Sequence, residues 1–188
     1  MPNWCNNNIS ITGPNSVIDK IEKITKEEDN ENGLLQFFHP MPKELLDTEA
    51  GPIAKTKTEK NARKSRKLEF GAENWYDWRV NNWSTKWEVC EFYGVDRQYH
   101  SEQNEGESTI SFAFSSAWAP PIGAYEKFLE NNSDCSVRAF YYEGGCDFMG
   151  EWYDGVDDCY APSDYKSTDD FWQDGIGSTI DDMFNICL

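Results

Sequence analysis

The chain has 188 residues and a formal net charge of −17, and aromatic residues make up 15% of it. This length is typical of one domain or of one domain with additions. So large an excess of acidic groups repels nucleic acid and argues against direct nucleic-acid binding. No apolar run approaches the roughly 18 residues that a membrane span needs, and no signal peptide is visible. We therefore expect a cytoplasmic protein without a membrane partner.

The N-terminal part of the chain predicts a strand, a helix and a long excursion. Ile9 and Ile11 alternate with polar residues, which is typical of a strand with one buried face. Apolar residues at helical spacing follow, and Asn15 or Ser16 is expected to cap that helix. Two prolines break the next apolar segment. Residues 48–67 hold almost no large apolar side chain, so we expect them to form a mobile excursion.

The rest of the chain predicts four strands, one longer helix and a tail. Alternation or aromatic and β-branched runs mark the strands, and a proline near the first turn marks the helix. The expected strands are residues 87–93, 108–116, 135–143 and 146–154, and the expected helix is residues 120–132. Residues 97–108 are expected to form a polar hairpin-type loop. Helix-start chemistry at Ser167 and Thr179 predicts two short helical pieces in the tail.

The order of these elements predicts the fold. Once the excursion is set aside, the core order is βαββαβ, which is the split-βαβ or ferredoxin-like pattern. We therefore predict an α+β fold in which an antiparallel sheet carries helices on one face. The ferredoxin-like domain would span residues 1–153, with an insertion at about residues 30–86. Residues 154–188 would form an acidic C-terminal extension packed on or flanking that domain.

Charge is distributed unevenly along the chain. Residues 55–67 contain seven basic residues and one acidic residue, whereas residues 134–188 contain thirteen acidic and two basic residues. We interpret the basic segment as a disordered loop that folds against the protein's own acidic surface, with phosphate contact as the alternative. The acidic third is interpreted as a solvated surface. In the alternative it imitates a phosphate backbone and occupies a nucleic-acid-binding partner.

Residues 73–88, ENWYDWRVNNWSTKWE, contain four tryptophans. At roughly 100° per residue, a helix there would place two indoles, a guanidinium and a carboxamide on one face about 100° wide. Such a face suits a flat anionic ligand, because rings stack and arginine supplies paired donors. A lysine just beyond and tryptophans from other motifs would complete the pocket. The candidate ligand-binding residues are Trp4, Trp75, Trp78, Arg79, Asn82, Trp83, Lys86 and Trp118.

A purely structural role for the same segment stays open. Tryptophans often brace a small sheet against an added helix, with an arginine stacked on their rings. In that interpretation Arg79 would pair with Asp77 or Glu88.

The sequence contains no recognised catalytic or cofactor-binding motif, so we expect neither enzyme activity nor a cofactor. His39, with nearby acids, is the candidate base of a hydrolase that we keep as a minority hypothesis. Six cysteines without a C-x-x-C pair favour small buried thiols over a zinc site. Paired aspartates lack the spacing of a calcium loop and are interpreted as solvated surface. We therefore expect no bound metal.

Five segments carry a resemblance to a known family. In chain order they are PNWCNNNISITG, FFHPMPKEL, NWYDWRVNNWSTKWE, FSSAWAPPIGAYEKF and YYEGGCDFMG. Together they resemble the YubB or Api-like family of bacteriophage and conjugative-plasmid proteins, over roughly residues 2–153. Ser84 stands where the family usually has glycine. The resemblance implies a ferredoxin-like domain and a mobile-element protein in the host cytoplasm, and it implies no agreed biochemical activity.

Two functional hypotheses follow. The first is a non-enzymatic accessory protein that binds a small, anionic, nucleotide-like ligand in the Trp- and Arg-lined pocket and sequesters a host defence signal. The second is an acidic protein–protein inhibitor, or nucleic-acid mimic, whose C-terminal surface acts on a host nucleic-acid-binding or defence protein.

Overall fold

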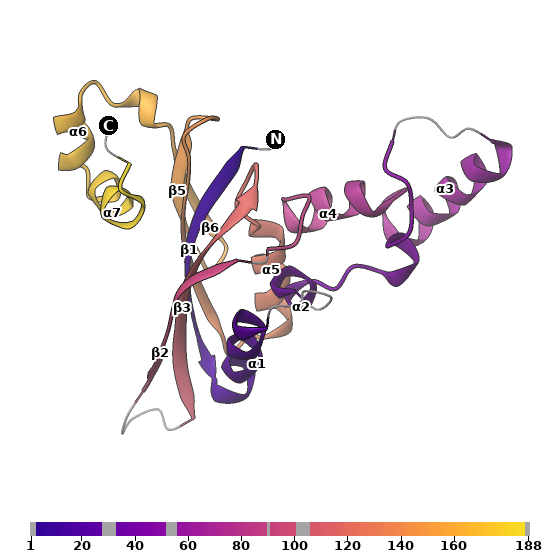
Figure 1. Cartoon of the computed structure of the whole chain (residues 1–188), viewed down its shortest axis with the longest axis horizontal. Coiled ribbons are helices and arrows are strands. Elements are labelled where there is room, and N and C mark those ends of the chain that lie inside the picture. The colour runs from indigo at the N-terminus through magenta and orange to yellow at the C-terminus, as the bar shows by residue number, and fades with distance from the viewer. Residues whose placement is uncertain (1–2, 28–32, 52–55, 90, 101–105, 187–188) are drawn as a thin grey trace.

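The protein forms a six-stranded antiparallel sheet with the strand order β2-β3-β1-β4-β5-β6 (Figure 1). The computed structural model describes residues 3–27, 33–51, 56–89, 91–100 and 106–186. The strands are β1 (Trp4–Pro14), β2 (Phe92–Tyr99), β3 (Glu107–Ala117), β4 (Ser136–Glu143), β5 (Phe148–Tyr153) and β6 (Val156–Tyr160).

The predicted ferredoxin-like fold is confirmed by the way two helices connect these strands. Helix α1 (Asn15–Lys26) follows β1, and α5 (Ile122–Asn131) follows β3. The first four strands then lie in the spatial order β2-β3-β1-β4, so β1 and β3 form the centre of the core sheet. This is the split-βαβ arrangement, to which β5 and β6 add two further strands beyond β4.

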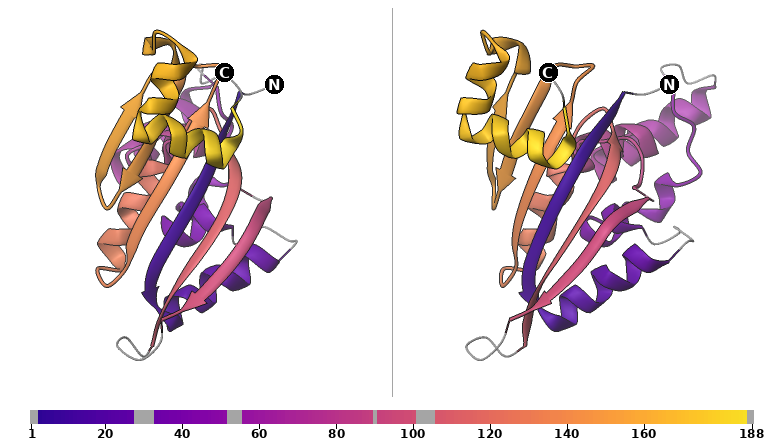
Figure 2. Two further views of the ribbon diagram at one scale, coloured as in Figure 1. Left: turned by 90° about the vertical axis from the view of Figure 1, so that its left-hand side faces the viewer. Right: turned by 60° about the vertical axis from the view of Figure 1, so that its left-hand side comes forward.

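The alternation of apolar and polar residues in β1 and β3 separates the two faces of the sheet. Ile9 and Ile11 are fully buried on the face of the sheet that α1, α2 and α5 cover (Figure 2). On the other face, the hydroxyl groups of Ser10 and Ser111 lie 2.7 Å apart. Antiparallel sheets commonly have one packed face and one polar face, as here.

The C-terminal extension covers part of that second face. Helices α6 (Thr168–Gln173) and α7 (Gly175–Phe184) lie on the opposite side of the sheet from α1, α2 and α5 (Figure 1). Phe171 and Ile180 pack there against Phe140 and Met149 in a second, smaller apolar cluster. The extension therefore packs on the sheet through a second core, to which β4 and β5 also contribute.

The insertion between α1 and β2 is largely helical. It contains α2 (Leu34–Phe38), the 3₁₀ turn η1 (Lys43–Leu45), α3 (Lys57–Phe70) and α4 (Trp75–Trp83). The expected mobile excursion over residues 48–67 is therefore wrong from Lys57 onward, while residues 52–55 lie outside the described part of the chain.

Helix α3 forms because both of its ends carry the required chemistry. The hydroxyl of Thr56 accepts a hydrogen bond from the backbone N–H of Glu59 at 3.1 Å, and Gly71 ends the helix at a φ of 76°. Arg63 then anchors the helix, since its guanidinium donates to the carbonyl oxygen of Gly51 at 2.6 Å. The basic segment that we expected to be a disordered loop is thus mostly a capped and anchored helix.

Several expected element boundaries also differ from the structure. The strand expected at residues 87–93 begins only at Phe92 and continues through Tyr99, into the expected loop. Strand β6 was not expected. Its five residues are all exposed, so its sequence has no alternation to reveal it.

The helix caps were predicted correctly in one case of three. Ser167 caps α6 as predicted, because its hydroxyl accepts from the backbone N–H of Asp170 at 3.1 Å. The next helix begins at Gly175 after the cap Asp174, and not at Thr179. Helix α1 has Pro14 at the N-cap position and no side-chain cap.

No helix in the described ranges is long and apolar enough to cross a membrane.

We expect Phe128→Ala to destabilise the protein by about 3 to 5 kcal/mol, the usual cost of removing a buried ring. Phe128 is 1% exposed and lies 4.5 Å, between ring centroids, from Phe38, so it joins α5 to the insertion. Urea titration monitored by far-UV circular dichroism would measure the loss. Leu68→Ala is the matched control, because Leu68 is 90% exposed and should change stability little. Equal losses in the two variants would contradict the assigned packing.

Candidate functional site

Helix α4 carries most of the tryptophan-rich segment, for which a helix was one hypothesis. It begins after Asn74, whose side-chain oxygen accepts from the backbone N–H groups of Tyr76 and Asp77 at 2.9 and 3.0 Å. It ends at Ser84, which has a φ of 66° and therefore takes the left-handed conformation of a helix stop. A φ of this sign is the conformation that glycine adopts most easily, so a serine is unusual at this position.

One group of the candidate residues packs into the core. Trp78 is 4% exposed and Trp83 is fully buried, and their rings meet edge to face with centroids 5.9 Å apart. The indole N–H of Trp83 donates to the carbonyl oxygen of His39 at 2.8 Å. The amide of Asn82 donates to the carbonyl oxygen of Trp78 at 2.8 Å. The indole of Trp83 therefore holds α4 against the chain around His39, whereas the amide of Asn82 bonds within the helix itself.

Arg79 is stacked between two indoles of the same helix. The central carbon of its guanidinium lies 5.3 Å from the ring centroid of Trp75 and 4.8 Å from that of Trp83. Its Nε is buried and has no hydrogen-bond partner among the described residues. Burial lowers the pKa of Arg79, and the negative charge of Glu88 acts in the opposite direction.

Glu88 acts on Arg79 through its negative charge, but no ion pair joins the two side chains among the described residues, so the pairing considered for Arg79 is not confirmed. The two oxygens of Glu88 accept from the backbone N–H groups of Leu35 and Gln36 at 2.7 and 2.8 Å. Burial raises the pKa of Glu88 despite these bonds and the charge of Arg79. The other carboxylate considered, Asp77, instead accepts from the side-chain amide of Asn74 at 2.7 Å.

The remaining candidates form a second group on the surface, which we call the indole cluster: Trp4, Lys86, Trp87 and Trp118. The ammonium nitrogen of Lys86 lies 4.0 Å from the ring centroid of Trp87 and 3.9 Å from that of Trp118. The rings of Trp4 and Trp87 have centroids 5.9 Å apart. The three tryptophans are 38–49% exposed. No carboxylate of the described residues forms an ion pair with Lys86.

Backbone pairing explains why these residues meet. Trp4 lies opposite Ala117 in the pairing of β1 with β3, so Trp4 and Trp118 share one end of the sheet. The backbone N–H of Trp118, which has a φ of 72°, donates to the carbonyl oxygen of Asn3 at 3.0 Å. The hydroxyl of Thr85 donates to the carbonyl oxygen of Ala117 at 2.8 Å and places the next residue, Lys86, at the same end.

The contacts thus divide the eight candidates into two groups. The first group, which we call the buried stack, is formed by the buried Trp78 and Trp83 and the partly buried Trp75, Arg79 and Asn82, and Trp4, Lys86 and Trp118 belong to the indole cluster. Trp87 is not among the eight candidates, because the sequence predicts it at the start of a strand. The signal that could have identified it is the step from a basic residue to an aromatic one in the segment TKWE.

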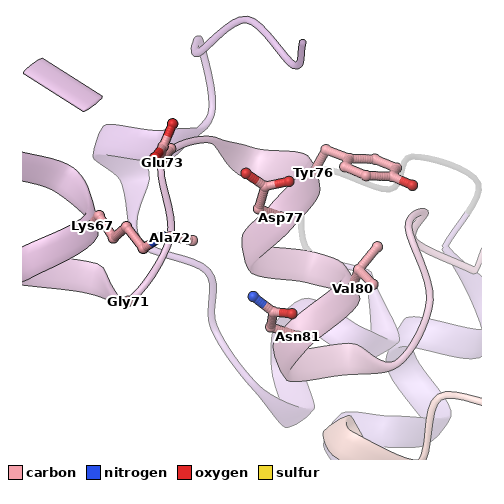
Figure 3. A pocket seen from close by; sticks show the side chains of 8 residues that line it. All are labelled: Lys67, Gly71, Ala72, Glu73, Tyr76, Asp77, Val80 and Asn81. Carbon is pink, nitrogen blue, oxygen red and sulfur yellow. The ribbon is translucent and has the colours of Figure 1, made fainter. Parts of the chain in front are cut away.

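A cavity of about 250 Å³ lies on the other side of α4 (Figure 3). Tyr76, Asp77, Val80 and Asn81 of α4 line it, and none of the eight candidates does. Lys67, Glu73 and the turn between α3 and α4 also line the cavity. Because the lining carries both positive and negative charge, it does not favour one class of ligand.

Other reactive side chains of the described residues do not gather into a site. Within the described ranges, no group of three or more His, Cys, Asp or Glu side chains could hold a metal ion. Cys5 is buried as expected, whereas Cys146 and Cys159 are exposed, so the expectation of buried thiols is wrong for both. Cys90 and Cys187 lie outside the described residues. Burial lowers the pKa of His39, whose Nδ1 lies 3.2 Å from the carbonyl oxygen of Asn82.

Comparison with known proteins gives a likeness of structure only. No family model and no curated protein matches the chain. The chain is similar to the crystal structure of protein api92 from Yersinia pseudotuberculosis, of the family model DUF1281. The TM-score is 0.43 and the sequence identity 12%, over 87% of this chain and 96% of that chain. The ferredoxin-like assignment rests on the strand order of this chain.

We expect Glu88→Gln to change how stability depends on pH. Because burial raises the pKa of Glu88 above its ordinary 4.5, the folded chain binds this proton more tightly than the unfolded chain. The associated stability is present below pH 4.5 and is lost as the pH rises through the raised pKa, by at most about 1.4 kcal/mol per pH unit. Relative to Glu88→Gln, the wild-type chain should lose free energy of unfolding from pH 4.5 toward neutrality.

Urea titrations at several pH values would measure this difference. Glu44→Gln, which changes an exposed carboxylate of η1, is the control. A wild-type minus Glu88→Gln difference that stays constant with pH would contradict the assignment.

Proposed function

We propose that the protein is a non-enzymatic binding protein whose indole cluster holds a small anionic aromatic ligand of the nucleotide class. The observation that carries the proposal is the position of Lys86, held between the exposed rings of Trp87 and Trp118 at 4.0 and 3.9 Å. This cation, which has no carboxylate partner in the part of the chain that the structure describes, stands beside three accessible indoles, one of them Trp4.

The chemistry of the cluster fits each part of such a ligand. A planar base stacks on an indole face, and stacking of this kind is worth about 1 to 3 kcal/mol per base. The Lys86 ammonium attracts a phosphate as a point charge. Because stacking is tolerant of base identity, the cluster should bind several nucleotides with similar affinity, and phosphate number should matter more than the base.

The buried stack has a supporting part in this proposal. Arg79 lies between Trp75 and Trp83 and is attracted by Glu88, two residues after Lys86 in the chain. It therefore braces the segment that carries the cluster, and the ligand contacts are made by the exposed residues. In a protein that resembles a mobile-element family, such binding would serve to sequester a nucleotide signal of the host.

Lys86→Met and Trp87→Leu should each weaken nucleotide binding by about tenfold, since one removes the cation and the other a stacking ring. Isothermal titration calorimetry with mono-, di- and triphosphates of adenosine and guanosine would measure the dissociation constants. Trp172→Leu is the control, because Trp172 is 47% exposed on α6, away from the cluster. Thermal denaturation would confirm that each variant is folded.

The absence of binding by any nucleotide in the wild-type chain would refute the proposal. So would equal weakening by the Trp172 control.

A further inference from the structure

Helix α3 has an anchoring face and a free face. At about 100° per residue, Arg63 and Arg66 lie on one side of the helix. The guanidinium of Arg63 is bound to Gly51 and Glu59, and Arg66 donates to the carbonyl oxygen of Glu73 at 2.7 Å. The arginines therefore hold the helix in place, and Figure 1 shows α3 standing away from the sheet.

The free face carries a row of basic side chains, which we call the basic stripe: Lys57, Lys60, Lys64 and Lys67. The spacing of three, four and three residues places them within one arc of about 100°. All four are exposed, and none forms an ion pair with a carboxylate of the described residues. Leu68 lies in the same arc and is 90% exposed.

The opposite end of the molecule has the complementary character. We call residues 154–186, which include β6, α6 and α7, the acidic lobe. It contains nine aspartates and one lysine. Asp158, Asp169 and Asp182 are exposed, and so are Trp172 at 47% and Met183 at 39%.

We propose that the chain self-associates head to tail, with the basic stripe of one copy bound to the acidic lobe of a second copy. Helix α3 and the helices α6 and α7 of the lobe lie at opposite ends of the molecule in Figure 1, so one copy cannot bring them together. Lysines face carboxylates across this contact, and Leu68 finds the apolar side chains of Trp172 and Met183. Such a heterologous contact generates a ring or an open filament.

A second copy fits the stripe better than nucleic acid does. A phosphate backbone would pair with the four lysines, but it offers no apolar partner for Leu68, and the net charge of −17 repels it. Two copies also repel each other globally. At physiological salt, however, that repulsion is screened beyond about 8 Å, whereas complementary charges in contact still attract.

The test is sedimentation velocity of the full chain over a range of concentrations and salt. The wild-type chain should show a sedimentation coefficient that rises with concentration and falls with added salt. Lys60→Glu/Lys64→Glu and Asp158→Lys/Asp182→Lys should each weaken association at least tenfold, by placing like charges together. The chain that combines all four changes should associate again, because it restores opposite charges with the signs exchanged.

Three results would overturn the proposal. The first is a wild-type chain that stays monomeric at all concentrations, and the second is a folded four-fold variant that fails to recover. The third comes from fluorescence anisotropy with a labelled DNA duplex: binding that depends on Lys60 and Lys64, without self-association, would assign the stripe to nucleic acid. Circular dichroism checks folding, and Lys60→Gln/Lys64→Gln, which removes charge without reversing it, should give an intermediate loss.

Discussion

The half-buried carboxylate of Glu88 joins the insertion to the chain that leads to β2, and the geometry of the candidate site depends on it. Both of its oxygens accept from backbone N–H groups at the start of α2. This approach requires Gly33, since a Cβ at that position would lie 2.2 Å from Cγ of Glu88. Donors that point at a carboxylate offset part of its desolvation, as does the charge of Arg79. One side chain therefore joins α2 to the chain that leads to β2.

That anchor determines which tryptophans are buried. Thr85 is tied to the carbonyl oxygen of Ala117, and Glu88 is turned toward α2. The two residues between them, Lys86 and Trp87, are left at the end of the sheet, where Trp4 and Trp118 arrive on β1 and just after β3. The same segment thus contributes a structural brace on one side and an exposed aromatic surface on the other. The two interpretations of this segment apply to different residues.

The sequence predicted the elements of the fold that have one buried face. Ile9 and Ile11 show alternation because one side of β1 is buried, and the ferredoxin-like order follows from such strands. Strand β6 forms by pairing its backbone with β5, with no buried face of its own, so no periodicity marks it. Helix α3 has a low apolar content, so the sequence signals that mark it are the cap at Thr56 and the stop at Gly71.

The site was predicted less completely, for a related reason. The helical wheel correctly grouped Trp75, Arg79 and their neighbours on one face of α4, but a wheel contains no information about what that face contacts. Trp78 and Trp83 meet the chain around His39, which lies more than thirty-five residues earlier. Contacts over such a separation depend on how α2 and α4 pack, and only the folded chain supplies that.

The role of each basic residue in α3 likewise depends on the face of the helix that it occupies. Arg63 and Arg66 form directed hydrogen bonds to backbone oxygens and hold α3 in place. Arginine suits this use, since its planar group presents several fixed donors, whereas lysine carries a hydrated point charge on a flexible stem. The lysines of α3 remain in solvent. A count of basic residues along α3 therefore overstates its free positive charge, since its exposed lysines face solvent and its arginines are bound to the chain.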